Sequence, residues 1–246
     1  MMRSFVSTLL FAVFVARVHA LPTELHTLGR RDNVCALNLR GATAKDCLVD
    51  NKGTFFTLTP PSTITATAVT CKPFNQNVYH HIVELQLLDG ALQKTGVCTM
   101  ITAMIKAQSS VSKAALLQPL SDVINGNKNL NFLASTVNNR KKTVVGNSLK
   151  GKGKAAGNDD LNVAVGNYLQ LTKASSTDIA KSLDVAVAKI IEQAQTIANA
   201  LPADSGTGRK KVTTKSDLEK AIATANKSKN PVSTAWQAVL DDAPHA

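Results

Sequence analysis

The sequence predicts a mainly α-helical protein, in which a disulfide-stapled N-terminal segment with short β-strands is followed by a helical bundle. Three observations predict this class. All four cysteines lie before residue 100, a threonine-rich stretch in the same part alternates polar and apolar residues, and the C-terminal half repeats apolar residues at helical spacing.

The first twenty residues form a leader with three parts. Arg3 precedes an apolar block over residues 5–16, and small residues flank a candidate cleavage point after Ala20. This pattern is typical of a secretory signal peptide. A membrane-spanning helix needs about 20 apolar residues in a row, and Arg17 interrupts the block before that length. We therefore expect a signal peptide over residues 1–20, an extracellular protein, and no integral membrane segment in the mature chain.

A short segment, residues 21–31, separates the leader from the first cysteine and ends in Arg30 and Arg31. We interpret it as a propeptide that is removed by cleavage on the pair of basic residues. A chance pair of arginines in an exposed terminal segment is the alternative. Cleavage would leave a mature chain that starts at Asp32 and has 215 residues, with 24 basic and 16 acidic side chains and a net charge of +8.

Four cysteines survive this processing: Cys35, Cys47, Cys71 and Cys98. In an oxidising compartment an even number of cysteines predicts disulfides, here two, and three pairings are open. Their spacings of 12, 24 and 27 residues contain no C-x-x-C pair, whereas zinc sites usually use close pairs. The sequence also lacks a phosphate-binding glycine loop and a dinucleotide fingerprint. We therefore expect neither a metal site nor a cofactor.

Residues 32–138 are expected to form a cysteine-containing α+β region. The alternation over Thr63–Thr70 predicts a strand after a proline turn, and two shorter stretches are weaker strand candidates. Apolar residues at helical spacing predict two helices, which Gly96 separates. The weaker strands are Leu37–Leu39 and Thr54–Leu58, the helices begin near Val78 and near Cys98, and Leu130–Val137 is expected to form a short helical turn.

Residues 139–158 are predicted to be a basic, flexible linker because positive charges and four glycines occur there without an acidic residue before 159. A charge run of this kind is usually a solvated loop, and a contact with an anionic surface is the functional alternative. Further processing at this run or at residues 209–211 is a third interpretation. The candidate contacts with an anionic surface are Arg140, Lys141, Lys142, Lys150, Lys152 and Lys154.

Residues 159–246 are expected to form a helical region. Its strongest signal is an apolar stripe at steps of four and three, which predicts an amphipathic helix over 177–201. Three further helices are expected to begin near Asp159, near Ser216 and at Pro231. Short joins between four helices indicate a bundle, and we expect the stripe to form its core rather than to contact a partner or a membrane.

Candidate chemistry is confined to His80, His81 and Glu84, which the pattern places on one predicted helix. Imidazole and carboxylate one turn apart could cleave RNA by general acid-base catalysis, but a surface pair is the simpler interpretation. The sequence contains no hydrolase or metalloprotease motif. We therefore predict no catalytic residue. Asn226 begins an N-x-S sequon and is the predicted glycosylation site.

The leader, the dibasic propeptide and the few cysteines resemble the small secreted proteins of filamentous fungi, among them effectors directed at plants. The resemblance covers residues 1–35 and the general cysteine pattern. It implies a secreted, non-enzymatic protein that acts in virulence by binding a host or cell-wall target. The alternative is an antifungal or killer-type toxin matured by proteolysis, for which secretion and amphipathic helices are also expected.

Overall fold

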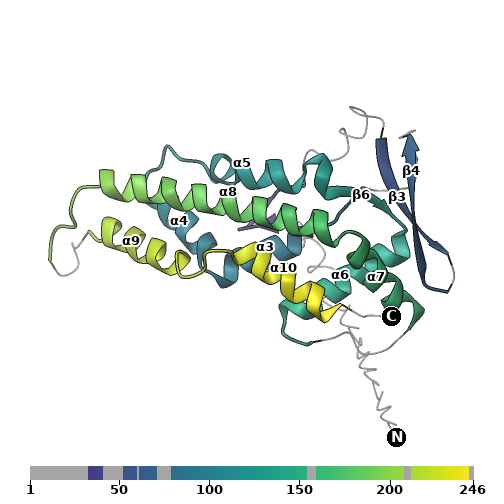
Figure 1. The fold of residues 1–246 in the computed structure, drawn as a ribbon. Helices are drawn as coiled ribbons and strands as arrows, with labels where there is room; N and C mark the ends of the chain where they lie inside the picture. Colours follow the sequence, from purple (N-terminus) through teal and green to yellow (C-terminus); the bar gives the residue numbers. More distant parts are fainter. Residues whose placement is uncertain are drawn as a thin grey trace, which may run out of the picture.

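The computed structural model describes residues 33–40, 52–59, 61–70, 79–153, 159–207 and 212–243. In this part of the chain eight α-helices account for most of the structure (Figure 1). They are α3 (Leu85–Lys94), α4 (Val97–Ala107), α5 (Lys113–Ile124), α6 (Ser135–Leu149), α7 (Asp160–Leu171), α8 (Lys173–Ala200), α9 (Thr214–Ala225) and α10 (Pro231–Asp242). The predicted mainly helical class is confirmed.

Six short strands form two small sheets within the described residues. They are β1 (Asn33–Val34), β2 (Leu37–Asn38), β3 (Lys52–Thr59), β4 (Thr63–Thr70), β5 (Tyr79–His81) and β6 (Leu130–Leu133). The larger sheet has the order β4-β3-β6-β5. Figure 1 shows the β3–β4 hairpin at one end of the helical body. The strands predicted over 37–39, 54–58 and 63–70 are therefore confirmed.

A tight hairpin begins the described chain and is fixed to the helices. Cys35 and Ala36 both have positive φ, which the two-residue turn between β1 and β2 requires. Cys35 is bonded to Cys98 of α4, and its backbone N–H donates to Asp89 Oδ1 at 2.8 Å. The Lys113 ammonium donates to the Cys35 carbonyl at 3.0 Å. One predicted disulfide is thus present, and it staples the N-terminal hairpin to the helical body.

The other two cysteines, Cys47 and Cys71, lie outside the described residues. In the β3–β4 ladder, Lys52 stands opposite Thr70, so the end of β4 lies beside the start of β3. Cys71 directly follows Thr70 in the chain. With Cys35 paired to Cys98, the one intramolecular pairing left for the expected second disulfide is Cys47 with Cys71.

The centre of the larger sheet differs from the prediction. Residues 130–133 form β6, which pairs parallel to β3 and antiparallel to β5, where a helical turn was expected. This prediction was wrong because a short apolar run has no clear period. Its strand state depends on the partner strand β3, which lies more than seventy residues earlier in the sequence.

Helix α8 confirms the strongest prediction from the sequence. Leu183, Val187 and Ile190 of its apolar stripe are buried, as are Ala194 and Ile197. They pack in the common core, as expected for the stripe of a bundle helix. Figure 1 shows α8 running along the helical body, with α9 and α10 beside it. The helix begins at Lys173, before the predicted start at 177, so this start was wrong.

Two other helix starts follow from capping chemistry. The Asp159 carboxylate accepts the Asn162 backbone N–H at 2.7 Å and caps α7, and Pro231 occupies the first turn of α10. The sequence predicted both. Helix α9 begins at Thr214, where Asp204 also accepts the Lys215 backbone N–H at 3.0 Å.

The predicted linker is wrong for residues 139–149, because they belong to helix α6. Val137, Lys141, Val144 and Val145 of this helix are buried, so the segment is an inner element. Its capped end continues into Lys150 and Gly151, whose backbone N–H groups donate to Asn147 and Ser148 carbonyls. Residues 154–158 lie outside the described part of the chain.

The two halves that the linker was expected to separate share one core. Helix α4 packs against α9, α5 against α8, and α3 against α10. Buried side chains from both halves belong to the same apolar cluster, which includes Leu88, Met104, Ile222 and Trp236. Residues before and after α6 therefore form a single packed body in the part that the structure describes.

Candidate functional site

The three residues with candidate chemistry do not lie on one helix, so this prediction was wrong. His80 and His81 belong to strand β5, and Glu84 is the residue that precedes α3. The apolar spacing after Pro73 suggested an earlier helix start, but pairing with β6 holds the histidines in extended backbone. Neighbouring residues of a strand point to opposite faces, so His80 and His81 have different surroundings.

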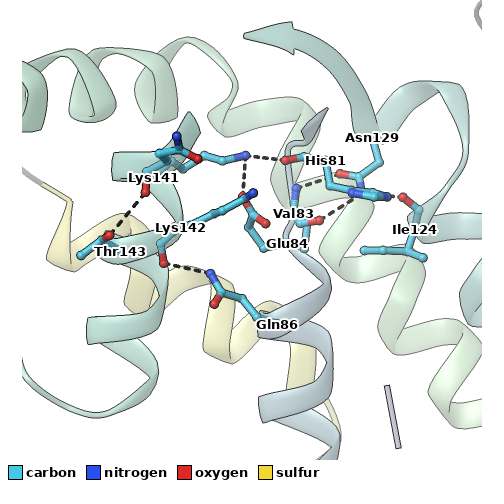
Figure 2. A network of polar contacts seen from close by, with 10 residues as sticks. His81, Val83, Glu84, Gln86, Ile124, Asn129, Lys141, Lys142 and Thr143 are labelled. Carbon is cyan, nitrogen blue, oxygen red and sulfur yellow. Dashed lines mark hydrogen bonds and ion pairs between the residues drawn. The ribbon is translucent and has the colours of Figure 1, made fainter. Parts of the chain in front are cut away.

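Glu84 forms an ion pair with Lys141 of α6 in the interior (Figure 2). Lys141 Nζ lies 2.9 Å from Glu84 Oε1, the lysine side chain is fully buried, and that of Glu84 is 8% exposed. The same ammonium also donates to the His81 carbonyl. It lies 5.5 Å from the centre of the Tyr168 ring, within range of a cation–π interaction. A buried lysine is tolerated only with such compensation.

His81 is held by an amide network. Its Nε2 lies 3.1 Å from Asn125 Oδ1, while Asn125 Nδ2 donates to the Leu39 carbonyl at 2.8 Å. Because an amide oxygen only accepts, His81 must carry its proton on Nε2. Burial is the main cause that lowers the pKa of His81, and the hydrogen bond to Asn125 opposes this shift. The ring is therefore a neutral donor within the fold.

His80 is more accessible but is also a poor acid or base. Burial, followed by the nearby charges of Lys141 and Lys142, lowers its pKa to about 3. Efficient general acid-base catalysis needs a pKa near the working pH, and a pKa of about 3 lies far below neutral pH. The geometry and charges around His80 and His81 thus favour a structural role for both.

Asn129 joins the strand to the start of α3. Its side chain accepts the Val83 N–H at 2.8 Å and donates to the Val83 and Ile124 carbonyls at 3.1 and 2.7 Å (Figure 2). The Asn129 carbonyl also accepts the Ile82 N–H at 2.8 Å. A fully buried asparagine that satisfies four backbone groups fixes the bend between β5 and α3. No local pattern in the sequence indicates this role.

Tyr168 of α7 lies beside Lys141 and packs against strand β3 of the larger sheet. Its ring meets the Phe56 ring edge to face, with centroids 5.0 Å apart. Burial is the largest cause that raises the pKa of the Tyr168 hydroxyl, so it stays protonated. We name Glu84, Lys141, His81, Asn125, Asn129 and Tyr168 the buried polar cluster. Its charged, imidazole and amide groups bond to one another or to nearby backbone groups, and Tyr168 contributes its ring beside Lys141, which is the arrangement of a structural core.

The six candidate contacts with an anionic surface have different surroundings. Arg140 forms an ion pair with Asp159 at 3.0 Å, and Lys141 is buried, so the prediction for Lys141 was wrong. The backbone carbonyl of Lys142 accepts from Gln86 at 2.9 Å, and its side chain is half-buried. Lys150 and Lys152 are exposed at the end of α6. Lys154 lies outside the described residues.

The other predicted sites concern processing and modification. Asn226 is exposed at the end of α9, so the predicted glycosylation site is accessible. The processing residues Ala20, Arg30 and Arg31 lie outside the described part of the chain. The start of β1 at Asn33 is two residues beyond Arg31, so a cut there would leave the anchored hairpin on the mature chain.

A surface groove of about 740 Å³ lies where both halves of the chain meet. Its floor and walls come from the ends of α3 and α6, the connection after α9, and one face of α10. The lining residues are Gly90, Ala91, Gln93, Lys94, Thr95, Ser148, Leu149, Thr224, Lys227, Ser228, Pro231, Thr234, Ala235 and Ala238. None of these fourteen residues is acidic. The sequence could not indicate this groove, because four separate segments build it.

No group of three or more His, Cys, Asp or Glu side chains among the described residues is arranged to hold a metal ion. In the same residues, no helix combines the length and the apolar character needed to cross a bilayer.

The fold and the site define a mainly helical, disulfide-containing protein with an internal polar cluster and a basic surface groove. Comparison of the chain with protein-family models, with curated proteins and with solved structures finds no match. Its function is therefore argued from its own residues.

Proposed function

We propose that this protein is a secreted, non-enzymatic binding protein, and that it acts as a fungal effector on a host or cell-wall target. The leader and the dibasic segment before Asp32 support secretion and maturation. The observation that carries the binding function is the groove, an open surface with exposed lysines and a mainly apolar lining. Pockets of this size accommodate drug-sized ligands or short peptide segments.

The surroundings of the histidines support binding over catalysis. The pKa of His80 is about 3, and His81 donates its ring N–H to a buried amide. Neither imidazole is poised to exchange protons with a substrate at extracellular pH.

The packing of α8 supports binding over membrane lysis, which is the activity expected of the alternative, an antifungal or killer-type toxin. A lytic helix needs an accessible apolar face. The stripe from Leu183 to Ile197 is buried against the rest of the bundle. Exposing it would require the bundle to open, so the effector proposal ranks first.

Three assays on the secreted, disulfide-intact protein test the proposal. It should bind saturably to isolated cell walls or to the surface of host cells, should release no dye from lipid vesicles, and should not degrade RNA. Dye release would favour the toxin instead. RNA cleavage that is lost in the His80→Ala and His81→Ala variants would show that the protein is a nuclease. If the protein binds saturably to neither cell walls nor host cells, the effector proposal is contradicted.

A further inference from the structure

Five exposed lysines from three distant parts of the sequence line the groove or lie within three residues of a lining residue. Lys94 and Lys227 line the groove. Lys150 directly follows the lining residue Leu149, Lys152 is the third residue after Leu149, and Lys229 directly follows Ser228. We name these five residues the groove lysines. No ion pair joins any of them to an acidic side chain within the described residues.

Two carboxylates lie as close in the chain to lining residues as these lysines do. Asp89 precedes the lining residue Gly90, and its Oδ1 accepts from the Cys35 N–H at 2.8 Å and from the lining residue Gln93 at 3.5 Å. On α10, three residues beyond the lining residue Ala238, Asp241 accepts from Gln237 at 2.8 Å. Five lysines against two carboxylates leave an excess of positive charge along the groove.

Helix ends modify this charge without cancelling it. Helices α3, α6 and α9 all end at the groove, and each carboxyl end carries about half a negative charge. Three such ends amount to roughly −1.5, against five lysine charges. A lysine near a helix end commonly does no more than offset the dipole. Here the number of lysines exceeds what three helix ends require, so an anion is the ligand that the groove favours.

The residues that line the groove indicate which class of anionic ligand fits it. Ala91, Leu149, Pro231, Ala235 and Ala238 give an apolar surface without any aromatic ring. Single-stranded nucleic acid is usually bound on aromatic platforms, and an acidic polysaccharide has little apolar surface to bury on such a floor.

A polypeptide that carries both carboxylates and small apolar side chains matches the lysines and the floor together. The hydroxyl groups of Ser228 and Thr234 supply donors and acceptors for its backbone, and those of Thr95 and Thr224, which donate to the Ala91 and Lys220 carbonyls, supply acceptors.

We propose that the groove binds an acidic polypeptide segment whose small apolar side chains rest on the alanine-rich floor while its carboxylates pair with the groove lysines. The inference rests on the proposed binding function and deepens it by naming the surface and the chemistry of the partner. Lys150 and Lys152, which the sequence assigned to an anionic contact, become part of this site.

The test uses fluorescence anisotropy with a labelled peptide of alternating Glu and Ala, and the secreted, disulfide-intact protein at physiological salt. A peptide of alternating Lys and Ala is the charge-reversed control, and it should not bind. The Lys94→Glu/Lys227→Glu variant should weaken binding about tenfold or more, since it replaces two attractions by repulsions. Ala238→Trp, at an exposed lining position, should also weaken binding because the indole fills the groove without changing the charge.

The matched control is Lys181→Glu/Lys189→Glu, which makes the same change of net charge at two exposed positions of α8, outside the groove. It should change the dissociation constant by less than about twofold. Circular dichroism and thermal unfolding verify that all variants are folded.

Equal weakening by both charge-reversal variants would overturn the inference, because binding would then reflect net charge alone. An unchanged affinity in Ala238→Trp would overturn it as well. Heparin or single-stranded RNA could instead displace the peptide. If Lys94→Glu/Lys227→Glu weakens the binding of that competitor as much as the binding of the peptide, the proposed class of partner is wrong.

Loss of peptide binding with intact binding to walls or cells would refute the groove inference and leave the proposed function standing. Intact peptide binding without binding to walls or cells would refute the proposed function alone.

Discussion

Replacement of Lys141 by methionine tests whether the buried polar cluster stabilises the fold. Lys141→Met keeps most of the length of the side chain but removes the ammonium that lies 2.9 Å from Glu84 Oε1. The carboxylate would remain buried without a counter-charge, and the His81 carbonyl would lose its donor. Breaking a buried ion pair on one side typically costs about 3 to 5 kcal/mol. This is a large part of the roughly 5 to 15 kcal/mol that stabilises a typical domain.

Urea unfolding with intact disulfides measures this loss, and the single tryptophan, Trp236, supplies the signal because it is buried. The midpoint of thermal unfolding should fall by roughly 6 to 20 °C for a chain of this size. Lys142→Met is the matched control: its side chain is half-buried, and the contact with Gln86 uses only its backbone carbonyl. We expect the control to change the free energy of unfolding by less than about 0.5 kcal/mol.

A second substitution distinguishes the unpaired charge from the lost packing as the cause of the destabilisation. Adding Glu84→Gln to Lys141→Met removes the unpaired carboxylate, so the double variant should recover at least about half of the lost stability. If Lys141→Met costs less than about 1 kcal/mol, or no more than Lys142→Met, the ion pair does not stabilise the fold. If the double variant is as unstable as Lys141→Met, lost packing rather than charge is the cause.

Three further predictions concern the disulfide, the histidine and the first turn. Cys35→Ser should lower the free energy of unfolding by about 4 kcal/mol, because the bridge to Cys98 closes a loop with a sequence separation of 63. Urea unfolding measures this loss, and a loss under about 1 kcal/mol would contradict the prediction. The pKa of His80 lies near 3 in the fold and at about 6.5 when unfolded, so only the unfolded state takes up a proton between these values. Stability should therefore fall as the pH drops from 6.5 towards 3, and His80→Gln should flatten this part of the profile; an unchanged profile would refute the assignment. Ala36→Gly should stabilise the hairpin by roughly 0.5 to 1 kcal/mol, since alanine has φ 64° there, and a lower thermal midpoint would argue against this turn.

Elements with a strong local signal could be predicted from the sequence. The stripe of α8 repeats every three or four residues, the strand Thr63–Thr70 alternates, and Asp159 and Pro231 have the chemistry of helix starts. In each case the residues that determine the structure lie within one element, so no distant partner has to be known.

Helix α6 shows why other elements could not be predicted. Its apolar stripe, which includes Val137 and Val144, is interrupted by Lys141, so a buried position appears as part of a basic run. The compensating charge, Glu84, lies 57 residues earlier. No local pattern connects the two.

The same reason applies to the two histidines and to the groove. His80 and His81 were assigned to a helix because their partner strand β6 lies about fifty residues later in the chain. The groove brings Lys94 and Lys227 together only once α3 has packed against α10 and α4 against α9. Residue types could be read from the sequence, whereas their assembly depends on contacts between distant segments.

The measurement that tests the central claim of a secreted, matured and disulfide-bonded protein most directly is its intact mass, determined before and after reduction on material recovered from culture medium, with N-terminal sequencing. The account predicts one chain that starts at Asp32 and gains four hydrogens on reduction, since all four cysteines are then paired. A start at Leu21 would contradict the propeptide, and retention of the chain inside the cell would contradict secretion. A mass that does not change on reduction would contradict the disulfides.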